Sequence, residues 1–343
     1  MSKAEFIKKI AKSKDRYTFL LGNGLSLYMK GLETGKEQNG VWSLILQAVA
    51  NKILLTTEAQ SLSSAKGRSD FEKANLIHQL SGLNCARLEC HIAEAIGENL
   101  KVLAWDRITA IPLLDYIWDK GHHILTTNFE DNIERYFFET KKVKIAPHIV
   151  KMVKSKSEKS GNEKSGKEHE TPQKQTINTR ERLNYRWNRY FSDQAISPVS
   201  VDFNGFGQNF GHDIWYLHGK MSQDNKKKRE ILFSFTDYIL ANNRFQHNYA
   251  NNIGKNYNCL DLIFNCPLVI AGIGLTESEI FLRNLLMKRF IIYKKSKSKV
   301  DQSFYLCPKS GGEHSDGRDF LKCLGFEIVE FKEYSDIYTS FQS

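Results

Sequence analysis

The chain has 343 residues, of which 41% are hydrophobic and 26% charged, an ordinary composition for a globular protein with one large domain or two small ones. No apolar run approaches the ~20 residues that span a bilayer, and the N-terminal segment has no signal-peptide stretch, so we expect a cytoplasmic protein without a membrane segment. The six cysteines are scattered and form no Cys-x-x-Cys pair, which argues against a zinc ribbon or a disulfide framework, and we expect no metal.

The first third of the chain is predicted to be mainly helical. A short amphipathic helix leads into a strand at 17–22, which is apolar throughout, as expected when helices cover both faces of a sheet. Helical periodicity follows at 41–53, 69–80 (opened by the capping-box spacing Ser69 to Glu72), 83–96 and 108–118. We therefore predict an all-helical subdomain at 40–118, inserted into a core formed by 1–39 and 119–343.

The rest of the chain alternates between strands and helices. Strands are predicted at 122–126, 215–217, 231–235, 267–273, 303–307 and 326–331, and helices at 129–139 and 277–292. Strands that alternate with helices indicate a parallel sheet. The sequence therefore predicts an α/β fold with a doubly wound, Rossmann-like parallel sheet.

The net charge of +10 is concentrated in one segment. Residues 141–190 contain fourteen Lys and Arg against five Glu, and the middle of this segment, 154–174, has almost no apolar residues. We predict a mobile basic insertion at 150–176. Such a segment could contact nucleic acid through phosphates, although a solvated loop that keeps the protein soluble explains it more simply.

Two glycine-containing loops follow predicted strands. In Gly22-Asn23-Gly24-Leu25-Ser26, glycines would let the backbone approach a phosphate, and the amides of a following helix would bind the anion. A plain tight turn explains these glycines equally well, since the third glycine of the dinucleotide fingerprint is missing. The second loop, 272–279, contains Gly272 and Gly274, which could simply be turn residues, followed by Leu275. Its last four residues form a capping box that gives Glu279 a structural alternative.

Two polar residues come directly after predicted strands, where the chemistry of an open α/β sheet usually lies. Asn128 follows the strand at 122–126, and His218 follows the strand at 215–217. Each has a structural alternative. Thr127 to Glu130 is spaced as a capping box, and Asn128 with Asp131 would also cap the next helix. A lone histidine at a strand end is commonly a packed side chain.

Taken together, four short segments carry a family resemblance. They are GNGLS (22–26), TTNFE (126–130), LHG (217–219) and GIGLTESE (272–279). In this order they resemble the sirtuin-type family, whose members bind NAD and break its nicotinamide–ribose bond. The resemblance spans roughly 15–335, and its specific parts are TTNFE and LHG.

The resemblance implies a role for each matching residue. Asn128 would hold the nicotinamide ribose and a water, and His218 would be the general base on a ribose hydroxyl or on that water. Of the NAD-binding residues, Gly22, Gly24 and Ser26 would hold the pyrophosphate, and Gly272, Gly274 and Leu275 would line the adenosine side. The full implied set is Gly22, Asn23, Gly24, Ser26, Thr127, Asn128, Gly272, Gly274, Leu275 and Glu279.

Departures from the family pattern narrow the expected activity. The chain has no four-cysteine zinc module after His218, residues 25–36 lack the Pro-Asp-Phe-Arg run, and Glu130 stands where the family commonly has aspartate. The zinc-free sequence and the helical insert look more like the bacterial anti-phage branch, whose members deplete cellular NAD on infection. We therefore expect an NAD+ glycohydrolase. The alternatives are an NAD-dependent protein deacylase or ADP-ribosyltransferase, and a non-catalytic module that senses NAD or ADP-ribose.

The residues suit this chemistry. Nicotinamide is a cationic leaving group, so the protein must mainly fix the ribose, place a water and offer a base. Histidine suits the base, and an amide, which both donates and accepts hydrogen bonds, suits positioning. Because a constitutive NAD hydrolase would poison its own cell, we expect a gate: a homo-oligomer, or a separate ATPase or sensor protein.

Overall fold

The computed structural model describes a large part of the chain. The described residues are 1–35, 41–64, 70–83, 85–141, 144–146, 199–202, 212–218, 259–275, 279–296, 302–309 and 315–341. The strand predicted at 231–235 and the basic insertion at 150–176 lie outside these residues. Within the described part, no helix combines the length and the apolar character needed to cross a membrane.

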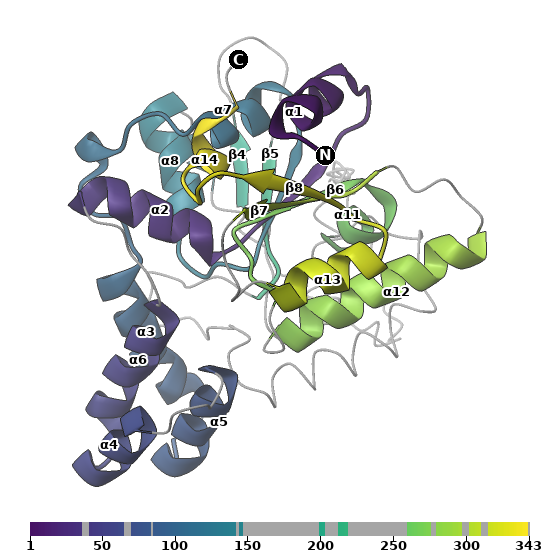
Figure 1. The fold of residues 1–343 in the computed structure, drawn as a ribbon. Coiled ribbons are helices and arrows are strands. Elements are labelled where there is room, and N and C mark those ends of the chain that lie inside the picture. The colour runs from purple at the N-terminus through teal and green to yellow at the C-terminus, as the bar shows by residue number, and fades with distance from the viewer. Residues whose placement is uncertain are drawn as a thin grey trace, which may run out of the picture.

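The centre of the molecule is one eight-stranded sheet (Figure 1). Its strands are β1 (Thr18–Leu21), β2 (His123–Thr126), β3 (Lys144–Ala146), β4 (Val199–Asp202), β5 (His212–Tyr216), β6 (Leu268–Ala271), β7 (Phe304–Pro308) and β8 (Glu327–Phe331). The order across the sheet is β3-β4-β5-β2-β1-β6-β7-β8. Six neighbouring strands run parallel, in the order β5-β2-β1-β6-β7-β8. The remaining two, β3 and β4, form an antiparallel edge that the sequence did not predict.

The parallel part has the strand order of a doubly wound α/β fold. The chain builds outward from β1 through β2 to β5, and then resumes on the other side of β1 with β6, β7 and β8. Numbered along the chain, this order is 3-2-1-4-5-6, in which ligands bind where the direction of winding reverses. That switch point lies between β1 and β6. The α/β class with a parallel sheet is confirmed.

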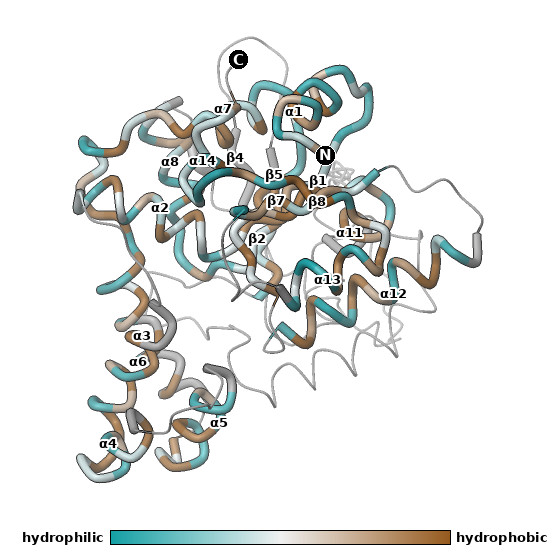
Figure 2. Tube along the Cα trace, viewed as in Figure 1, coloured by the Kyte–Doolittle hydropathy of each residue, from teal (hydrophilic) through white to brown (hydrophobic). Residues whose placement is uncertain are grey.

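Helices cover both faces of the sheet. One face packs against α1 (Lys3–Lys12), α2 (Asn23–Thr34), α7 (Pro112–Asp119), α8 (Asn132–Lys141) and α14 (Asp336–Thr339). The other packs against α11 (Cys259–Asn265), α12 (Ile280–Ser296) and α13 (Ser315–Cys323). In β1, Phe19 and Leu21 face the first core and Leu20 faces the second, which is why the strand is apolar throughout. Figure 2 shows these hydrophobic strands at the centre of the molecule.

Four helices between β1 and α7 form a third hydrophobic cluster, which extends away from the sheet (Figure 1). They are α3 (Val41–Ile53), α4 (Thr56–Ser64), α5 (Asp70–Ser81) and α6 (Cys85–Asn99), followed by the short 3-10 helix η1 (Trp105–Arg107). The cluster runs from Ile45 to Leu100 and includes Phe129 from the loop after β2. Helix α7, which the sequence grouped with these helices, packs on the sheet. The domain division at 40 and 118 stays a prediction.

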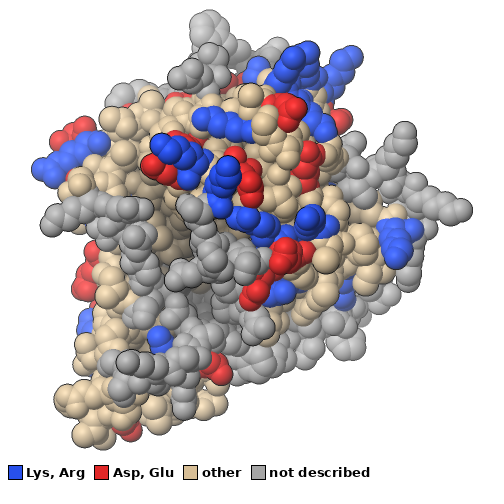
Figure 3. Space-filling model, in the orientation of Figure 1, with Lys and Arg blue, Asp and Glu red and all other residues tan. Residues whose placement is uncertain are grey.

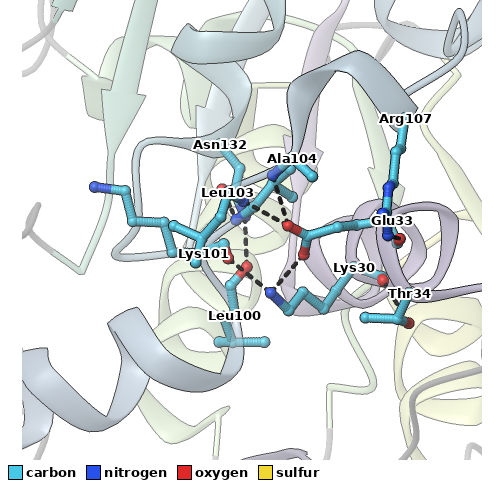
Figure 4. Close-up of polar contacts among 10 residues, drawn as sticks. Lys30, Glu33, Thr34, Leu100, Lys101, Leu103, Ala104, Arg107 and Asn132 are labelled. Carbon is cyan, nitrogen blue, oxygen red and sulfur yellow. Dashed lines mark hydrogen bonds and ion pairs between the residues drawn. The ribbon is translucent and has the colours of Figure 1, made fainter.

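Three side chains hold the loop that leads from α6 back to the sheet (Figure 4). Glu33 accepts two backbone N–H hydrogen bonds from loop 100–104, both of 2.7 Å, and pairs with Lys30 at 2.5 Å. Lys30 also donates to a carbonyl of that loop at 3.0 Å. From α8, Asn132 donates to the same backbone at 2.9 Å and accepts from it at 3.0 Å. The loop is therefore fixed to α2 and α8.

Exposed lysines gather on α1. Lys3, Lys8, Lys9 and Lys12 are exposed, whereas Phe6 and Ile10 of the same helix are fully buried. Lys and Arg side chains accordingly gather at the end of the molecule that carries α1 (Figure 3). Part of the positive charge therefore lies outside the basic segment that the sequence singled out.

Candidate functional site

The loops singled out in the sequence lie at one edge of the sheet. In the sheet, Leu21 lies beside Thr126 on one side and beside Ala271 on the other, and Thr126 lies beside Tyr216. These four residues are at or near the ends of parallel strands, so the loops that follow all emerge at the carboxyl edge. The described parts of the four sequence segments therefore lie at the same edge of the sheet.

The turn between β1 and α2 packs tightly against the loop after β6. The Gly22 amide donates to the Ala271 carbonyl and the Gly24 amide to the Gly272 carbonyl, both at 3.0 Å. A Cβ at Gly22 would lie 2.3 Å from Cγ1 of Ile273 and 2.5 Å from the Gly272 oxygen. The close approach of the two loops therefore explains why residue 22 is a glycine, and no ligand is needed to explain it. Its neighbour Asn23, also predicted to bind NAD, is the first residue of α2.

Two tyrosines near the end of the chain lie against these glycines. A Cβ at Gly24 would lie 2.5 Å from the hydroxyl of Tyr334 and 2.8 Å from that of Tyr338. Gly272 has a φ of +72°, and its Cβ would lie 2.7 Å from the Tyr338 hydroxyl. Sequence reasoning missed both tyrosines, because nothing local in residues 332–341 indicates contact with a turn more than 300 positions earlier.

The loop after β6 has an unusual backbone and leads to a half-buried acid. Leu275 has a positive φ of 49°, and a Cβ at Gly317 of α13 would lie 2.2 Å from the Gly274 carbonyl oxygen. Glu279 follows in a short turn before α12, and burial raises the pKa of its carboxyl to about 7. Its Oε2 has no hydrogen-bond partner among the described residues. Residues 276–278 lie outside them, so the predicted capping box stays a prediction.

Asn128 does not cap a helix. The predicted helix start at 129 is wrong, since α8 begins at Asn132 and leaves Asn128 four residues ahead of it. The physical reason is that other groups hold this segment. The backbone N–H of Asn128 donates to Oγ1 of Thr126 at 3.1 Å, and the Thr127 N–H donates to the Leu21 carbonyl at 3.1 Å. Helix capping is therefore not the role of Asn128.

The side-chain amide of Asn128 is buried and held from α2. It is 4% exposed, and its Nδ2 donates to Oγ of Ser26 at 2.8 Å. Its Oδ1 has no hydrogen-bond partner in the described part of the chain. Buried polar atoms without partners are uncommon in folded proteins and call for an explanation. A ligand hydrogen bond is one such explanation.

Glu130 joins this group, although it was not among the predicted site residues. The Ser26 hydroxyl donates to Oε1 of Glu130, and the two residues are 0% and 2% exposed. Burial raises the pKa of the Glu130 carboxyl, an effect that the hydrogen bond from Ser26 partly offsets. The sequence signal that could have indicated this residue was its position, two residues after Asn128.

His218 is buried near two phenylalanine rings. It is 3% exposed, and its ring centroid lies 6.2 Å from that of Phe129 and 6.4 Å from that of Phe281. Burial lowers the pKa of its imidazole to about 3. The imidazole is therefore neutral at physiological pH, which allows it to accept a proton. Its pKa is well below the near-neutral value expected for an efficient base.

A second buried acid lies near the end of β5. The hydroxyl of Tyr216 donates to Oε1 of Glu134 at 2.6 Å, and both residues are buried. Asp131, between the two buried glutamates in the chain, pairs with Lys101 at 3.8 Å. Among the residues that the structure describes, no three His, Cys, Asp or Glu side chains are grouped so that they could hold a metal ion.

Comparison with known proteins does not indicate a function for this site. The sequence matches no family model, and it matches no curated protein. The function must therefore be argued from the fold and from the residues at the carboxyl edge.

Proposed function

We propose that the protein is an NAD+ glycohydrolase with a Rossmann-like core. One observation carries the proposal: Asn128 and His218 each lie two residues beyond Thr126 and Tyr216, which are paired positions of adjacent parallel strands. This is the carboxyl edge beside the β1–β6 switch point, where folds of this strand order bind nucleotides. An amide and a neutral imidazole at matching strand ends are suited to one ribose.

Asn128 and His218 can together support cleavage of the nicotinamide–ribose bond. Cleavage of the nicotinamide–ribose bond passes through an oxocarbenium-like transition state, and nicotinamide leaves as a neutral base without being protonated. Asn128 accepts a hydrogen bond from a ribose hydroxyl or from the attacking water, and His218 takes the proton. The N-terminus of the 12-residue α2 offers a positive end for the pyrophosphate.

The site is closed in this structure, and that affects both binding and catalysis. Asn128 and His218 are almost fully buried, so NAD must separate the loops of the carboxyl edge in order to reach them. The burial that lowers the pKa of His218 would then be relieved by contact with ribose hydroxyls and water. We expect this exchange to raise the pKa of the imidazole and to make it a better base.

The direct test is product formation. Purified protein is incubated with NAD+, and nicotinamide and ADP-ribose, including any cyclic form, are quantified by chromatography. Asn128→Ala and His218→Ala are each expected to lower turnover by roughly 10²–10⁴. The controls are Asn99→Ala in α6 and His123→Gln at the opposite end of β2, which should retain turnover. Near-wild-type turnover in either site variant would refute the assignment.

The biological role that we propose is depletion of NAD during phage infection in bacteria. A gate is then required, through a homo-oligomer or through a separate ATPase or sensor protein. The test compares cellular NAD and phage growth in cells that express wild type or Asn128→Ala. Native mass spectrometry on the purified protein complements it, because a lone monomer with full activity would rule out both kinds of gate.

A second candidate is a module that binds NAD or ADP-ribose without cleaving it. The lowered pKa of His218 favours it, because a weak base fits binding better than turnover. Calorimetry with ADP-ribose discriminates: binding with no nicotinamide released over hours would support this module against the hydrolase. Deacetylation of an acetyl-lysine peptide would instead indicate the deacylase alternative.

A further inference from the structure

The three polar residues next to the β1–α2 turn form a hydrogen-bond chain with a fixed direction. A serine hydroxyl has one hydrogen to donate and two lone pairs that accept. The Ser26 hydrogen is directed to Oε1 of Glu130. Only acceptor capacity remains on Ser26 for Asn128, which therefore presents its Nδ2 at 2.8 Å.

The direction of the chain determines what Asn128 offers to a ligand. Because its nitrogen is held by Ser26, its oxygen is the atom left without a partner among the described residues. If the amide were reversed, it would offer two donors in place of one acceptor. A ribose hydroxyl or a water that must donate a hydrogen bond requires the observed orientation.

We propose that Glu130 is a positioning residue, which acts through Ser26 to hold the Asn128 amide with its oxygen free to accept a hydrogen bond from the substrate. The proposal rests on the proposed NAD-cleaving function. Glu130 itself need not touch substrate. An ionised carboxylate can only accept hydrogen bonds, so it forces Ser26 to donate to it and thereby excludes the reversed amide.

The groups that face Glu130 make the effect of acid predictable. Asp131 is adjacent in the chain and pairs with Lys101, and Glu134 holds the Tyr216 hydroxyl, so the neighbouring charges are mainly negative. When Glu130 becomes protonated, its carboxyl can donate to Ser26, and the constraint on Asn128 is lost. Turnover of the wild type should therefore fall as the pH is lowered and Glu130 becomes protonated. A Glu130→Gln variant should not show this decrease.

The experiment compares three variants. Glu130→Gln replaces the obligate acceptor with an amide that can either donate or accept, and Ser26→Ala removes the link to Asn128. Glu134→Gln is the matched control, since it neutralises a nearby buried acid that accepts from the Tyr216 hydroxyl, whereas the Ser26 hydroxyl donates to Glu130. We expect kcat to fall roughly 10- to 100-fold in the first two variants, with KM within about threefold in Glu130→Gln, because misplaced groups lose rate more than binding. The control should keep both constants.

A second readout does not depend on catalysis. In protein labelled with ¹⁵N on asparagine, the side-chain NH₂ resonance of Asn128, assigned by its loss in Asn128→Asp, should move in Glu130→Gln and in Ser26→Ala and stay in place in Glu134→Gln. An unmoved resonance in Glu130→Gln would overturn the positioning role, and so would a moved resonance with full turnover. If wild type releases no nicotinamide, the proposed function fails on its own, and the resonances still decide the orientation. If Glu130→Gln does not fold, Ser26→Ala provides both measurements.

Discussion

Replacing Glu33 by alanine is expected to destabilise the protein by about 3–5 kcal/mol. Glu33 is 8% exposed, and its carboxylate accepts two backbone N–H hydrogen bonds of 2.7 Å from Leu103 and Ala104. Hydrogen bonds to a charged group contribute about 1.5–3 kcal/mol each. The two bonds would sum to about 3–6 kcal/mol, and solvent that reaches the freed N–H groups reduces the loss.

The assay is urea unfolding at neutral pH, with Glu94→Ala as the matched control. Glu94 also pairs with a lysine, Lys52, but both side chains are about half exposed. Exposed pairs of this kind contribute about 0–1 kcal/mol, so the control should shift stability by less than 1 kcal/mol. Comparing Glu33→Ala with Glu94→Ala therefore separates the effect of burial on the free energy of unfolding from the effect of pairing with a lysine.

The effect of pH provides an independent check. Although burial alone would raise it, the pKa of Glu33 is lowered because hydrogen bonds from Lys30, Ala104 and Leu103 stabilise the charged form. A carboxyl with a lowered folded-state pKa contributes stability above its unfolded pKa and loses it as pH falls through the folded pKa. The gap between wild type and Glu33→Ala should therefore close below about pH 4. A gap smaller than 1 kcal/mol at pH 7 would refute the reasoning.

Three further predictions concern the core. Gly22→Ala should destabilise the protein by about 1–3 kcal/mol in thermal unfolding, because the new methyl would overlap Ile273; unchanged stability would show that the two loops can separate freely. His218→Gln should remove a pH dependence: wild type buries a neutral imidazole whose pKa is about 3 folded and about 6.5 unfolded, so its stability relative to the variant should fall by about 2 kcal/mol between pH 7 and pH 5. Arg289→Ala should cost about 2–4 kcal/mol in urea unfolding, since this buried side chain donates to two carbonyls and to Ser303; a loss below 1 kcal/mol would mean that water replaces it.

The elements with the strongest local signals were predictable from sequence. The helix predicted at 41–53 has the bounds of α3, and five predicted strands lie within a few residues of β1, β2, β6, β7 and β8. Strands β1, β6 and β7 are buried along their whole length, because helices cover both faces, and such apolar runs are recognisable without tertiary information. The α/β class follows from their alternation with helices.

Elements that depend on distant partners were missed. The strands β3 and β4 pair with each other across more than fifty residues, and nothing in their own short sequences marks them. The start of α8 was predicted too early, because Thr127 to Glu130 is spaced as a capping box while its groups bond to Ser26 and to the end of β1. In both cases tertiary contacts decided what the local sequence left open.

The candidate site was partly visible in the sequence. The order of strands and motifs was enough to place Asn128 and His218 at one sheet edge, because chain position relative to a strand end determines the edge. The hydrogen-bond chain through Glu130 and the contact of two tyrosines with the glycine turn depend on packing between α2, α8 and α14. Local periodicity carries no information about such packing.

The register of β1 has a consequence for biosynthesis. This central strand pairs on one side with β2 and on the other with β6, where Thr18 lies beside Leu268, about 250 residues later in the chain. At a translation rate of about 5–20 residues per second, a ribosome needs roughly 12–50 s to synthesise the intervening chain. During that time one side of an entirely apolar strand has no partner, so the nascent protein should depend on chaperones, and chains truncated before residue 268 should aggregate.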